Sequence, residues 1–305
     1  MKIFFAKLLL FGEYGLMFGA RALAVPFLRY SGWLAKPGEN SVSDPAIEKS
    51  TVELERFVSW FRHEQLNATM NFPIDLDRLQ QDIGENLFFQ SDIPFEYGVG
   101  SSGALCAALF HEYSIYGKNL NQVGRKHSLP EALKHDFSVM ESYFHGKSSG
   151  LDPLVSFLNQ PVFFDNNHIS LPYLRTDRLP FSVYLLDTGS PGATYPLVAI
   201  FLEKMQDPDF KAGFIRDYLP ANDGAVEAFL HGKQEELFSK LRQISGFQLN
   251  YLSRMIPEPF PDIIRQLLKQ GICVKLLGSG GGGFLLAFVP QGAEAGLPGN
   301  GLKVF

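Results

Sequence analysis

The pattern of hydrophobic positions predicts two strands at the start of the chain. Residues 2–11 and 22–30 are mostly apolar, and the glycine-containing segment 12–19 joins them. Short apolar runs bounded by turn residues are typical of β-strands. The first run is not typical of a signal peptide, because Lys7 interrupts it and no small-residue cleavage site follows. The polar segment 31–45, with Gly, Pro and Ser, predicts a loop.

Helical spacing of apolar residues predominates in the middle of the chain. Helices are predicted over 46–66, from an N-cap at Asp75 to about Gln90, from Ser101 to about Tyr116, over 130–144 and, with proline interruptions, over 191–270. Strands are predicted at 161–165 and 181–187, and a strand, glycine loop and strand at 271–289. The last 16 residues contain several Gly and Pro and predict a loosely held tail.

The order of these elements indicates an α+β fold. Strands come first, helices follow and a strand pair returns near the end, which differs from the regular alternation of a doubly wound fold. We expect two lobes, an N-terminal lobe at 1–175 and a C-terminal lobe at 176–305.

Composition and charge narrow the range of functions to consider. The net charge is −5 and the pI near 5.8, whereas nucleic-acid-binding surfaces are basic. No run approaches the roughly 18–20 apolar residues that span a bilayer. The 28 Phe, spread along the chain, predict a phenylalanine-rich core. Cys106 and Cys273 lie in apolar runs and predict buried free thiols, so we expect a cytoplasmic protein.

A glycine- and serine-rich segment, Pro94–Ala104, runs into a predicted buried helix. Its glycines let the backbone come close to a ligand. Ser101 and Ser102 stand where the helix begins, and the N–H groups and dipole of a helix start favour a phosphate. A serine hydroxyl there can also reach Mg²⁺. The alternative is an ordinary turn that caps a core helix.

A second glycine-rich segment, Gly278–Gly283, lies between two apolar runs. A flexible linker would have polar flanks. Its position therefore predicts close approach of the backbone to a ligand or to another loop. The alternative is a tight connection between two strands.

Charged residues in apolar or loop positions suggest acid–base chemistry. Asp152 is the strongest candidate for deprotonating a substrate hydroxyl, and Glu141 on the preceding helix could hold Mg²⁺ beside phosphates. Alternatively, Asp152 caps a helix and Glu141 is solvated. Lys7 either has a buried partner, as catalytic lysines often do, or points outward from an edge strand. Glu13 is either a turn carboxylate or a site group. The P-loop, protein-kinase, Rossmann and nucleophile-elbow motifs do not occur.

The ordered motifs resemble those of the GHMP kinases, the superfamily of galactokinase, homoserine kinase, mevalonate kinase and phosphomevalonate kinase. Lys7–Gly19 resembles K-x-x-L-x-G-E-H-x-x-x-x-G, and Pro94–Ala104 resembles P-x-G-x-G-x-G-S-S-x-A. Lys275–Gly283 resembles K-L-T-G-x-G-G-G-G. The resemblance covers residue 1 to about 289.

Within this superfamily the chain most resembles the mevalonate kinases. His145–Asp152 matches their H-G-x-x-S-G-x-D block, and Glu141 matches their metal-binding glutamate. Asp187 and Thr188, followed by Thr194, match their D-T-x-x-x-x-x-T block.

The resemblance implies an ATP- and Mg²⁺-dependent kinase with ATP in a cleft between a β-rich N-terminal lobe and an α/β C-terminal lobe. The implied acceptor is mevalonate, the product 5-phosphomevalonate and the pathway isoprenoid biosynthesis. By position, Asp152 would orient or deprotonate the hydroxyl, Lys7 would lower its pKa, and Thr194 would lie near the transferring phosphoryl group. Ser102 and Glu141 would hold Mg²⁺. The residues implied to bind ATP are Gly98, Gly100, Ser101, Ser102, Gly103, Ala104, Gly280 and Gly281.

Several positions depart from the superfamily pattern. They are Phe5-Ala6 for Pro-Gly, Tyr14 for a histidine, Glu96 for a glycine, and Gly189 and Gly192 for a lysine and an arginine. Because Lys7, Ser102, Glu141 and Asp152 are retained, the kinase prediction stands. The acceptor prediction is weaker, since another residue must replace the missing cation or the acceptor differs.

Other functions stay open at this point. The acceptor could be phosphomevalonate, a sugar or homoserine, and a diphosphomevalonate decarboxylase is less consistent with the His145–Asp152 block. A non-catalytic nucleotide-binding member of the fold would have lost a catalytic carboxylate or lysine, which this sequence retains. We expect ATP and a small hydroxylated substrate as partners, with no nucleic acid or membrane. A homodimer is a family-level expectation.

Overall fold

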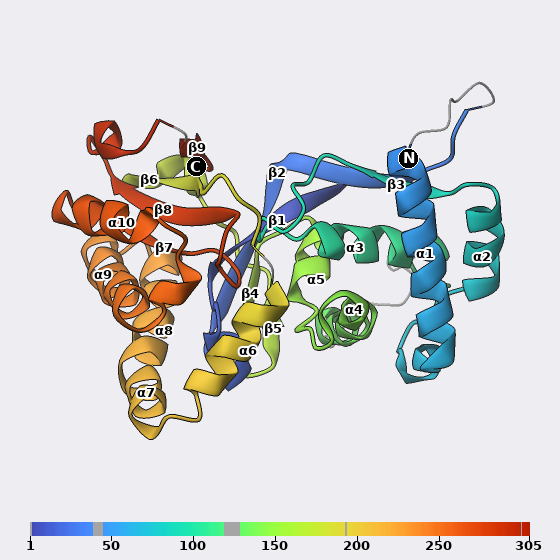
Figure 1. Cartoon of the computed structure of the whole chain (residues 1–305), viewed down its shortest axis with the longest axis horizontal. Helices are drawn as coiled ribbons and strands as arrows, with labels where there is room; N and C mark the ends of the chain where they lie inside the picture. The colour runs from blue at the N-terminus through green and yellow to red at the C-terminus, as the bar shows by residue number, and fades with distance from the viewer. Residues whose placement is uncertain (1, 39–44, 119–128, 193, 300) are drawn as a thin grey trace. The chain divides into compact units, whose positions relative to one another are not determined.

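The computed structural model describes residues 2–38, 45–118, 129–192, 194–299 and 301–305 (Figure 1). The strands are β1 (Phe4–Phe11), β2 (Ala22–Ala35), β3 (Phe88–Ser91), β4 (Val162–Asp165), β5 (His168–Ser170), β6 (Phe181–Asp187), β7 (Cys273–Leu276), β8 (Phe284–Pro290) and β9 (Gly301–Lys303). The helices are α1 (Pro45–His63), α2 (Leu76–Gly84), α3 (Ser101–Tyr113), α4 (Leu129–His145), α5 (Leu151–Leu158), α6 (Thr194–Lys204), α7 (Pro208–Gly213), α8 (Leu219–Leu230), α9 (Gln234–Tyr251) and α10 (Phe260–Lys269).

Within the described residues the strands form two sheets. The first has the order β1–β2–β4–β5, and β3 also pairs with β2; the second has the order β7–β8–β6–β9. In the second sheet β6 pairs with β8 in antiparallel register, from Phe181 opposite Pro290 to Asp187 opposite Phe284. Residues 284–289 are buried on both faces of β8, which explains why this strand is continuously apolar. The predicted α+β class is confirmed.

The chain divides into two compact units, each made of separate segments. Unit 1 comprises 1–7, 26–94 and 100–160, and unit 2 comprises 8–25, 95–99 and 161–305. β1 and β2 therefore contribute residues to both units. The predicted lobes, 1–175 and 176–305, divide the chain at one point and stay a prediction. The two compact units differ from these predicted lobes because 8–25 and 95–99 pack with 161–305.

The core of unit 1 surrounds α3, which is buried along most of its length as predicted. Phe110 on α3 lies 5.0 Å from Phe137 on α4 and 5.4 Å from Phe157 on α5, measured between ring centroids. Burial of one such side chain contributes roughly 1.5–3 kcal/mol. These contacts fix the helices that carry the candidate site.

The core of unit 2 is also rich in phenylalanine. The ring centroids of Phe201 and Phe214 lie 5.2 Å apart, and the ring of Phe11 on β1 stacks on that of Phe288 on β8. The predicted phenylalanine-rich core is confirmed. Both cysteines are free and buried, as predicted. Burial raises the pKa of Cys273 to about 12 and that of Cys106 well above its usual range, so both thiols are poor nucleophiles.

Two local predictions between 31 and 90 are wrong. β2 continues to Ala35 instead of giving way to a loop at 31, because Gly32–Ala35 pair with Phe88–Ser91. The helix capped by Asp75 ends at Gly84 instead of Gln90. The remainder of the predicted loop, 39–44, lies outside the described residues.

The predicted loose tail is also wrong. β9 pairs with β6, with Leu302 opposite Leu185, and thus completes an edge of the second sheet. The short strand β5 was not predicted; its Ile169 pairs with Phe164 of β4. In the part of the chain that the structure describes, no helix has the length and apolarity needed to cross a membrane.

Candidate active site

A lysine–aspartate pair lies at the centre of the candidate site in unit 1. Lys7 on β1 is 3% exposed, and its Nζ lies 2.9 Å from Oδ2 of Asp152 in the first turn of α5. The Asp152 side chain is 29% exposed, so one end of the pair is reachable from solvent. Lys7 does not point outward from an edge strand. Asp152 is not a cap either, because α5 begins at Leu151 after Gly150, with no side-chain cap.

Glu141 on α4 forms the second part of the site. Its side chain is buried, and Ser102 Oγ donates a hydrogen bond to Oε1 at 3.2 Å. Ser148 Oγ donates to Oε2. The alternative of a solvated helix residue is therefore wrong. Glu141 and Ser102 present oxygen atoms, the ligand type that Mg²⁺ prefers.

The electrostatic environment keeps the Glu141 carboxyl largely protonated near neutral pH. Burial raises its pKa to about 8, and the negative charge of Asp152 acts in the same direction. Hydrogen bonds from Ser148 and Ser102 and the charge of Lys7 oppose the shift. A divalent cation bound there would supply the positive charge that the ionised form needs.

The start of α3 packs closely against the first turn of α5 at Gly103. Gly100 is the N-cap residue with φ of 78°, and no side chain caps the helix. A Cβ on Gly103 would lie 2.9 Å from the backbone of Asp152 and Pro153, so only glycine allows this close approach. Ala104 N–H donates to the Gly100 carbonyl at 3.0 Å. The prediction that a helix begins at Ser101 is confirmed.

The glycine loop, defined as Gly278–Gly283, connects β7 to β8 in unit 2. Gly281 N–H donates to the Met255 carbonyl at 2.6 Å, and Gly283 N–H donates to the Ser190 carbonyl at 2.6 Å. Thr188 Oγ1 donates to the Gly283 carbonyl at 2.8 Å. The loop therefore approaches other loops closely, which is more than a tight strand connection requires. Gly280 is buried.

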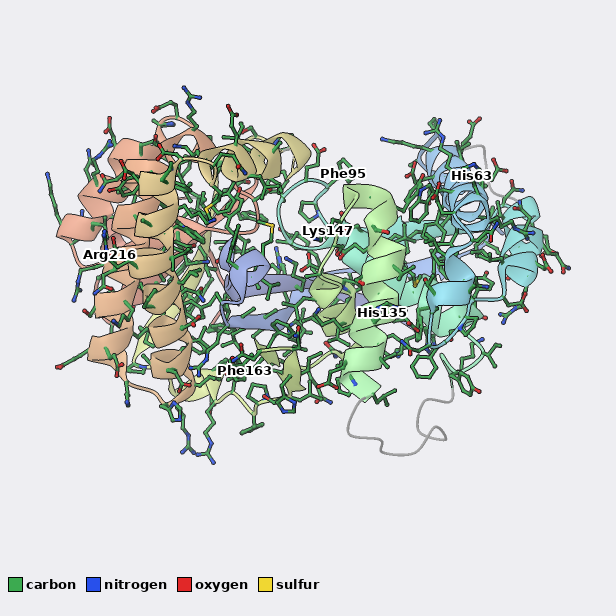
Figure 2. The ribbon with its side chains drawn as sticks, turned by 90° about the horizontal axis from the view of Figure 1, so that it is seen from below. His63, Phe95, His135, Lys147, Phe163 and Arg216 are labelled. Carbon is green, nitrogen blue, oxygen red and sulfur yellow. The ribbon has the colours of Figure 1, made fainter. Side chains whose placement is uncertain are left out.

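The glycine loop also contacts the first part of the Pro94–Ala104 segment, residues 95–99 of unit 2. A Cβ on Gly283 would lie 2.5 Å from Tyr97 Cα, and just before the loop the Leu277 carbonyl oxygen would lie 2.9 Å from a Cβ on Gly98. Phe95 precedes this contact and is 73% exposed (Figure 2). Two segments predicted to approach a ligand thus pack on each other.

Two contacts join the turn at Glu13 and Tyr14 to β7 and the glycine loop, and sequence reasoning did not find them. Lys275 Nζ donates a hydrogen bond to the Glu13 carboxylate, and both residues are at most 2% exposed. Tyr14 OH donates to the Ser279 carbonyl at 2.5 Å, and its ring stacks on Phe201 at 4.3 Å. The sequence signal for this ion pair was that Lys275 and Glu13 each lie beside apolar residues.

Gly189 and Gly192 stand where the superfamily pattern has a lysine and an arginine. The surroundings of these two glycines differ from each other. A Cβ on Gly192 would lie 2.6 Å from the Gly280 carbonyl oxygen and 2.8 Å from the Gly282 nitrogen. A side chain at 192 would therefore displace the glycine loop. Gly189 has open space around it but a φ of 78°. Thr194 is the first residue of α6, and its side chain lies outside the described part of the structure.

Two charged or titratable side chains outside the cluster lie on the surface. His63 is exposed at the end of α1, and Lys147 is exposed between α4 and α5 (Figure 2). Among the described residues no group of three or more His, Cys, Asp or Glu side chains could hold a metal ion. Magnesium would thus depend on Glu141, Ser102 and bound phosphates, which is common for this ion.

Comparison with known sequences finds similarity to mevalonate kinases. No family model matches the chain. It is 25% identical over 307 residues to the mevalonate kinase of Pyrococcus horikoshii, covering 93% of this chain and 87% of that protein. The mevalonate kinase of Archaeoglobus fulgidus is 26% identical over 279 residues, covering 91% and 88%.

Solved structures share the fold. L. major mevalonate kinase in complex with R-mevalonate has a TM-score of 0.61 at 17% identity, covering 96% of this chain and 88% of that one. Streptococcus pneumoniae phosphomevalonate kinase, in complex with phosphomevalonate and AMPPNP, has a TM-score of 0.61 at 16% identity, covering 97% and 94%. Lactococcus lactis galactokinase complexed with galactose has a TM-score of 0.60 at 14% identity, covering 95% and 86%. Together with the ordered motifs, these similarities support the resemblance of the chain to the GHMP kinase superfamily, and to mevalonate kinases within it.

Proposed function

We propose that the protein transfers the γ-phosphoryl group of Mg²⁺-bound ATP to the primary hydroxyl of mevalonate. The observation that carries the proposal is the Lys7–Asp152 pair, held in one unit with Glu141 and Ser102. The archaeal relatives are named mevalonate kinases, and two structural neighbours hold R-mevalonate and an ATP analogue. Phosphoryl transfer depends on positioning and charge neutralisation more than on covalent chemistry.

Each residue of the cluster has a distinct role in this proposal. The Asp152 carboxylate accepts the hydroxyl proton as the hydroxyl oxygen bonds to the γ-phosphorus and the bond to the leaving ADP oxygen breaks. The Lys7 ammonium, 2.9 Å from Asp152, stabilises the developing negative charge. Glu141 and Ser102 would hold Mg²⁺, which neutralises charge on the phosphates when bound. Thr194, Gly98 to Ala104, Gly280 and Gly281 keep the roles that the resemblance implies.

The acceptor is the part of the proposal with a specific competitor. Because Gly192 cannot carry a cationic side chain beside the glycine loop, the acceptor could be phosphomevalonate, a sugar or homoserine. A nucleotide-binding protein without turnover is the candidate from a different functional class.

The test is an ADP-release assay with purified protein, ATP and Mg²⁺ against mevalonate, phosphomevalonate, homoserine and galactose. We expect turnover with mevalonate alone. Turnover with another acceptor would keep the kinase assignment and replace the substrate. ATP-dependent thermal stabilisation without turnover on any acceptor would favour the non-catalytic function.

Magnesium binding should depend on pH through Glu141. The folded-state pKa is about 8, above the usual 4.5, so a cation must displace a proton below that value. From about pH 6 to about pH 8 we expect the apparent Mg²⁺ affinity in the presence of ATP to rise by up to about tenfold per pH unit. Above about pH 8 it should level off. Titration of Mg²⁺ against ATP binding at several pH values measures this.

The matched control for the pH effect is Glu141→Gln, which cannot ionise. This variant should bind Mg²⁺ more weakly and retain only the pH dependence of ATP itself. The same shift predicts that, without Mg²⁺, the stability contributed by protonated Glu141 is complete below about pH 4.5 and is lost as pH rises through about 8. Equal pH profiles in both proteins would show that Glu141 is not the titrating ligand.

Loss of the Tyr14 hydroxyl should impair nucleotide binding more than folding. Tyr14→Phe keeps the ring stacked on Phe201 but removes the donor to the Ser279 carbonyl. Since the glycine loop packs on residues 95–99, we expect the KM for ATP to rise about tenfold, with kcat changed less. Steady-state kinetics measure the changes in KM and kcat separately. Tyr173→Phe, at a site 87% exposed, is the control and should match the wild type.

A further inference from the structure

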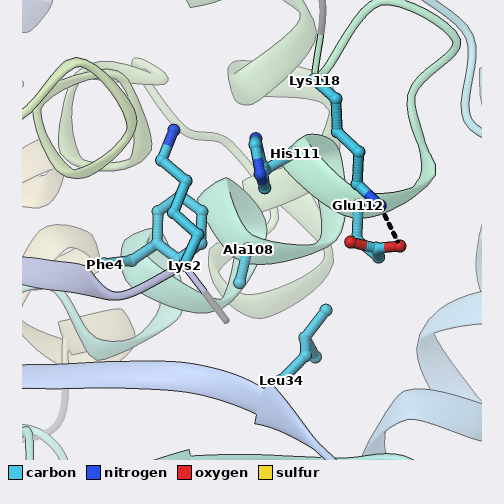
Figure 3. Close-up of a pocket in the computed structure, with 7 residues that line it drawn as sticks. All are labelled: Lys2, Phe4, Leu34, Ala108, His111, Glu112 and Lys118. Carbon is cyan, nitrogen blue, oxygen red and sulfur yellow. Dashed lines mark hydrogen bonds and ion pairs between the residues drawn. The ribbon is translucent and has the colours of Figure 1, made fainter.

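A pocket of about 390 Å³ lies beside the C-terminal half of α3, whereas Ser102 stands at the start of that helix. Figure 3 shows the residues that line the pocket. Its lining residues all belong to unit 1 and are Lys2, Phe4, Leu34, Ala108, His111, Glu112 and Lys118. His111 is ten residues after Ser101, which corresponds to about 15 Å along a helix. The volume is in the range of small-molecule sites, about 300–1,000 Å³. The pocket is therefore separate from the cluster assigned to phosphoryl transfer.

Lys2 brings a positive charge to this pocket without a carboxylate partner among the described residues. Its Nζ lies 5.2 Å from the ring centroid of Phe4 and 4.9 Å from that of Phe157. Burial lowers the pKa of Lys2, which shows that its charge is incompletely solvated. An anion in the pocket would stabilise this ammonium group.

His111 faces the same space from α3 (Figure 3). Its Nδ1 lies 3.2 Å from the Gly117 carbonyl oxygen, which leaves Nε2 as the second ring atom available for a ligand. Burial lowers the pKa of His111, and the positive charge of Lys2 lowers it further. Lys118 acts in the same direction, whereas Glu112 and the Gly117 carbonyl oppose it. A bound anion would remove the repulsion between Lys2 and protonated His111.

The carboxylate of Glu112 does not neutralise these two groups, because it is already paired. Lys118 Nζ lies 2.6 Å from its Oε1, and Arg78 donates a hydrogen bond to the same atom. A neighbouring hollow, also lined by Glu112, shows the contrast: its Lys36 is paired with Asp82 at 2.7 Å and with Glu85 at 2.6 Å. Only the first pocket combines an uncompensated lysine with a histidine, among the described residues of these two hollows.

We propose that this pocket is a second ligand site, which binds a small organic phosphate. Lys2 and protonated His111 hold the phosphate, since two adjacent cations match a dianion. Phe4, Leu34 and Ala108 contact the organic part through apolar surface. Binding favours protonated His111, so it takes up a proton near pH 7. The site requires no kinase activity, and its test is independent of the proposed function.

The experiment follows the ring resonances of His111 by NMR in the full-length protein, with His111→Gln to assign them. The probes are inorganic phosphate and phenyl phosphate, added with ATP and Mg²⁺ present so that the candidate active site is occupied. We expect both probes to raise the pKa of His111, and phenyl phosphate to bind more tightly because it also contacts the apolar floor. Lys2→Met should weaken both probes about tenfold or more. Lys36→Met, in the neighbouring hollow, is the matched control and should bind as the wild type does.

Three outcomes would overturn the proposal. The first is a His111 resonance that neither probe moves at any pH in a titration from about pH 5 to about pH 8, the range around the usual histidine pKa. The second is equal binding in wild type and Lys2→Met. The third is equal weakening in Lys2→Met and Lys36→Met, which would indicate general electrostatic attraction. Each result stands whether or not the protein phosphorylates mevalonate.

Discussion

Asp152→Asn is expected to reduce kcat by about 10²–10⁴-fold, the usual contribution of a positioned general base. The amide keeps the shape of the carboxylate but cannot accept the hydroxyl proton. Mg²⁺–ATP binding should not weaken, because Ser102 and Glu141 are unaltered and the loss of the Asp152 charge favours the ionised form of Glu141. Coupled ADP release at saturating substrate gives kcat, and ATP titration of the variant gives the binding constant.

Two variants separate this catalytic role from a structural one. Asp177→Asn, at an exposed site, is the control and should leave kcat unchanged. Lys7→Met should also lower kcat, and the double variant should be little worse than Asp152→Asn, because paired catalytic groups act as a unit. Wild-type turnover by Asp152→Asn would remove Asp152 from the mechanism. Strictly additive losses would show that Lys7 and Asp152 act independently.

The parts of the site encoded by local patterns could be predicted from the sequence. The glycines and serines of Pro94–Ala104 placed the start of α3 at Ser101, and the structure has it there. Lys7 in an apolar run predicted either a buried lysine with a partner or one that points outward, and the structure shows the first. Its partner, Asp152, lies 145 positions further along the chain, and no periodicity connects the two. Only the family motifs brought these residues into one hypothesis.

The errors in the fold arise where distant pairing overrides local composition. Ser31 and Gly32 are turn-forming residues, yet β2 continues because β3 supplies hydrogen-bond partners along its edge. The glycine- and proline-rich end predicted a tail, yet Gly301–Lys303 pair with β6. A β-strand depends on a neighbour that the local sequence does not specify. Helices such as α3 satisfy their backbone internally and were located more accurately.

The same distinction explains why the buried pair of Glu13 and Lys275 was missed. In the sequence each of the two is a charged residue beside apolar residues. Their pairing, however, joins positions that are 262 residues apart. Burying two charges costs several kcal/mol per ion unless the partner and hydrogen bonds compensate. Lys275 also donates to the Leu276 carbonyl at 2.9 Å, so its position is fixed by two acceptors.

Lys275→Met should therefore cause the largest loss of stability among the variants considered. It leaves the Glu13 carboxylate in a site where it is 2% exposed, without the ammonium group that donates to it. Removing one partner of a buried pair costs about 3–5 kcal/mol. We expect the melting temperature to fall by about 10 °C, measured by calorimetry. Lys233→Met, which breaks an exposed pair with Glu236, should cost at most about 1 kcal/mol.

The double variant Glu13→Gln/Lys275→Met distinguishes a charge effect from a packing effect. If the loss in Lys275→Met comes from burying the Glu13 carboxylate without this ammonium group, neutralising Glu13 should recover much of the stability. If it comes from a poor fit of methionine, the double variant should be as unstable as the single one. A single variant as stable as Lys233→Met would show that the pair contributes little to folding. The pair joins the turn at Glu13 to β7, the strand before the glycine loop. Recovery of stability without recovery of the KM for ATP would therefore assign the ion pair a positioning role.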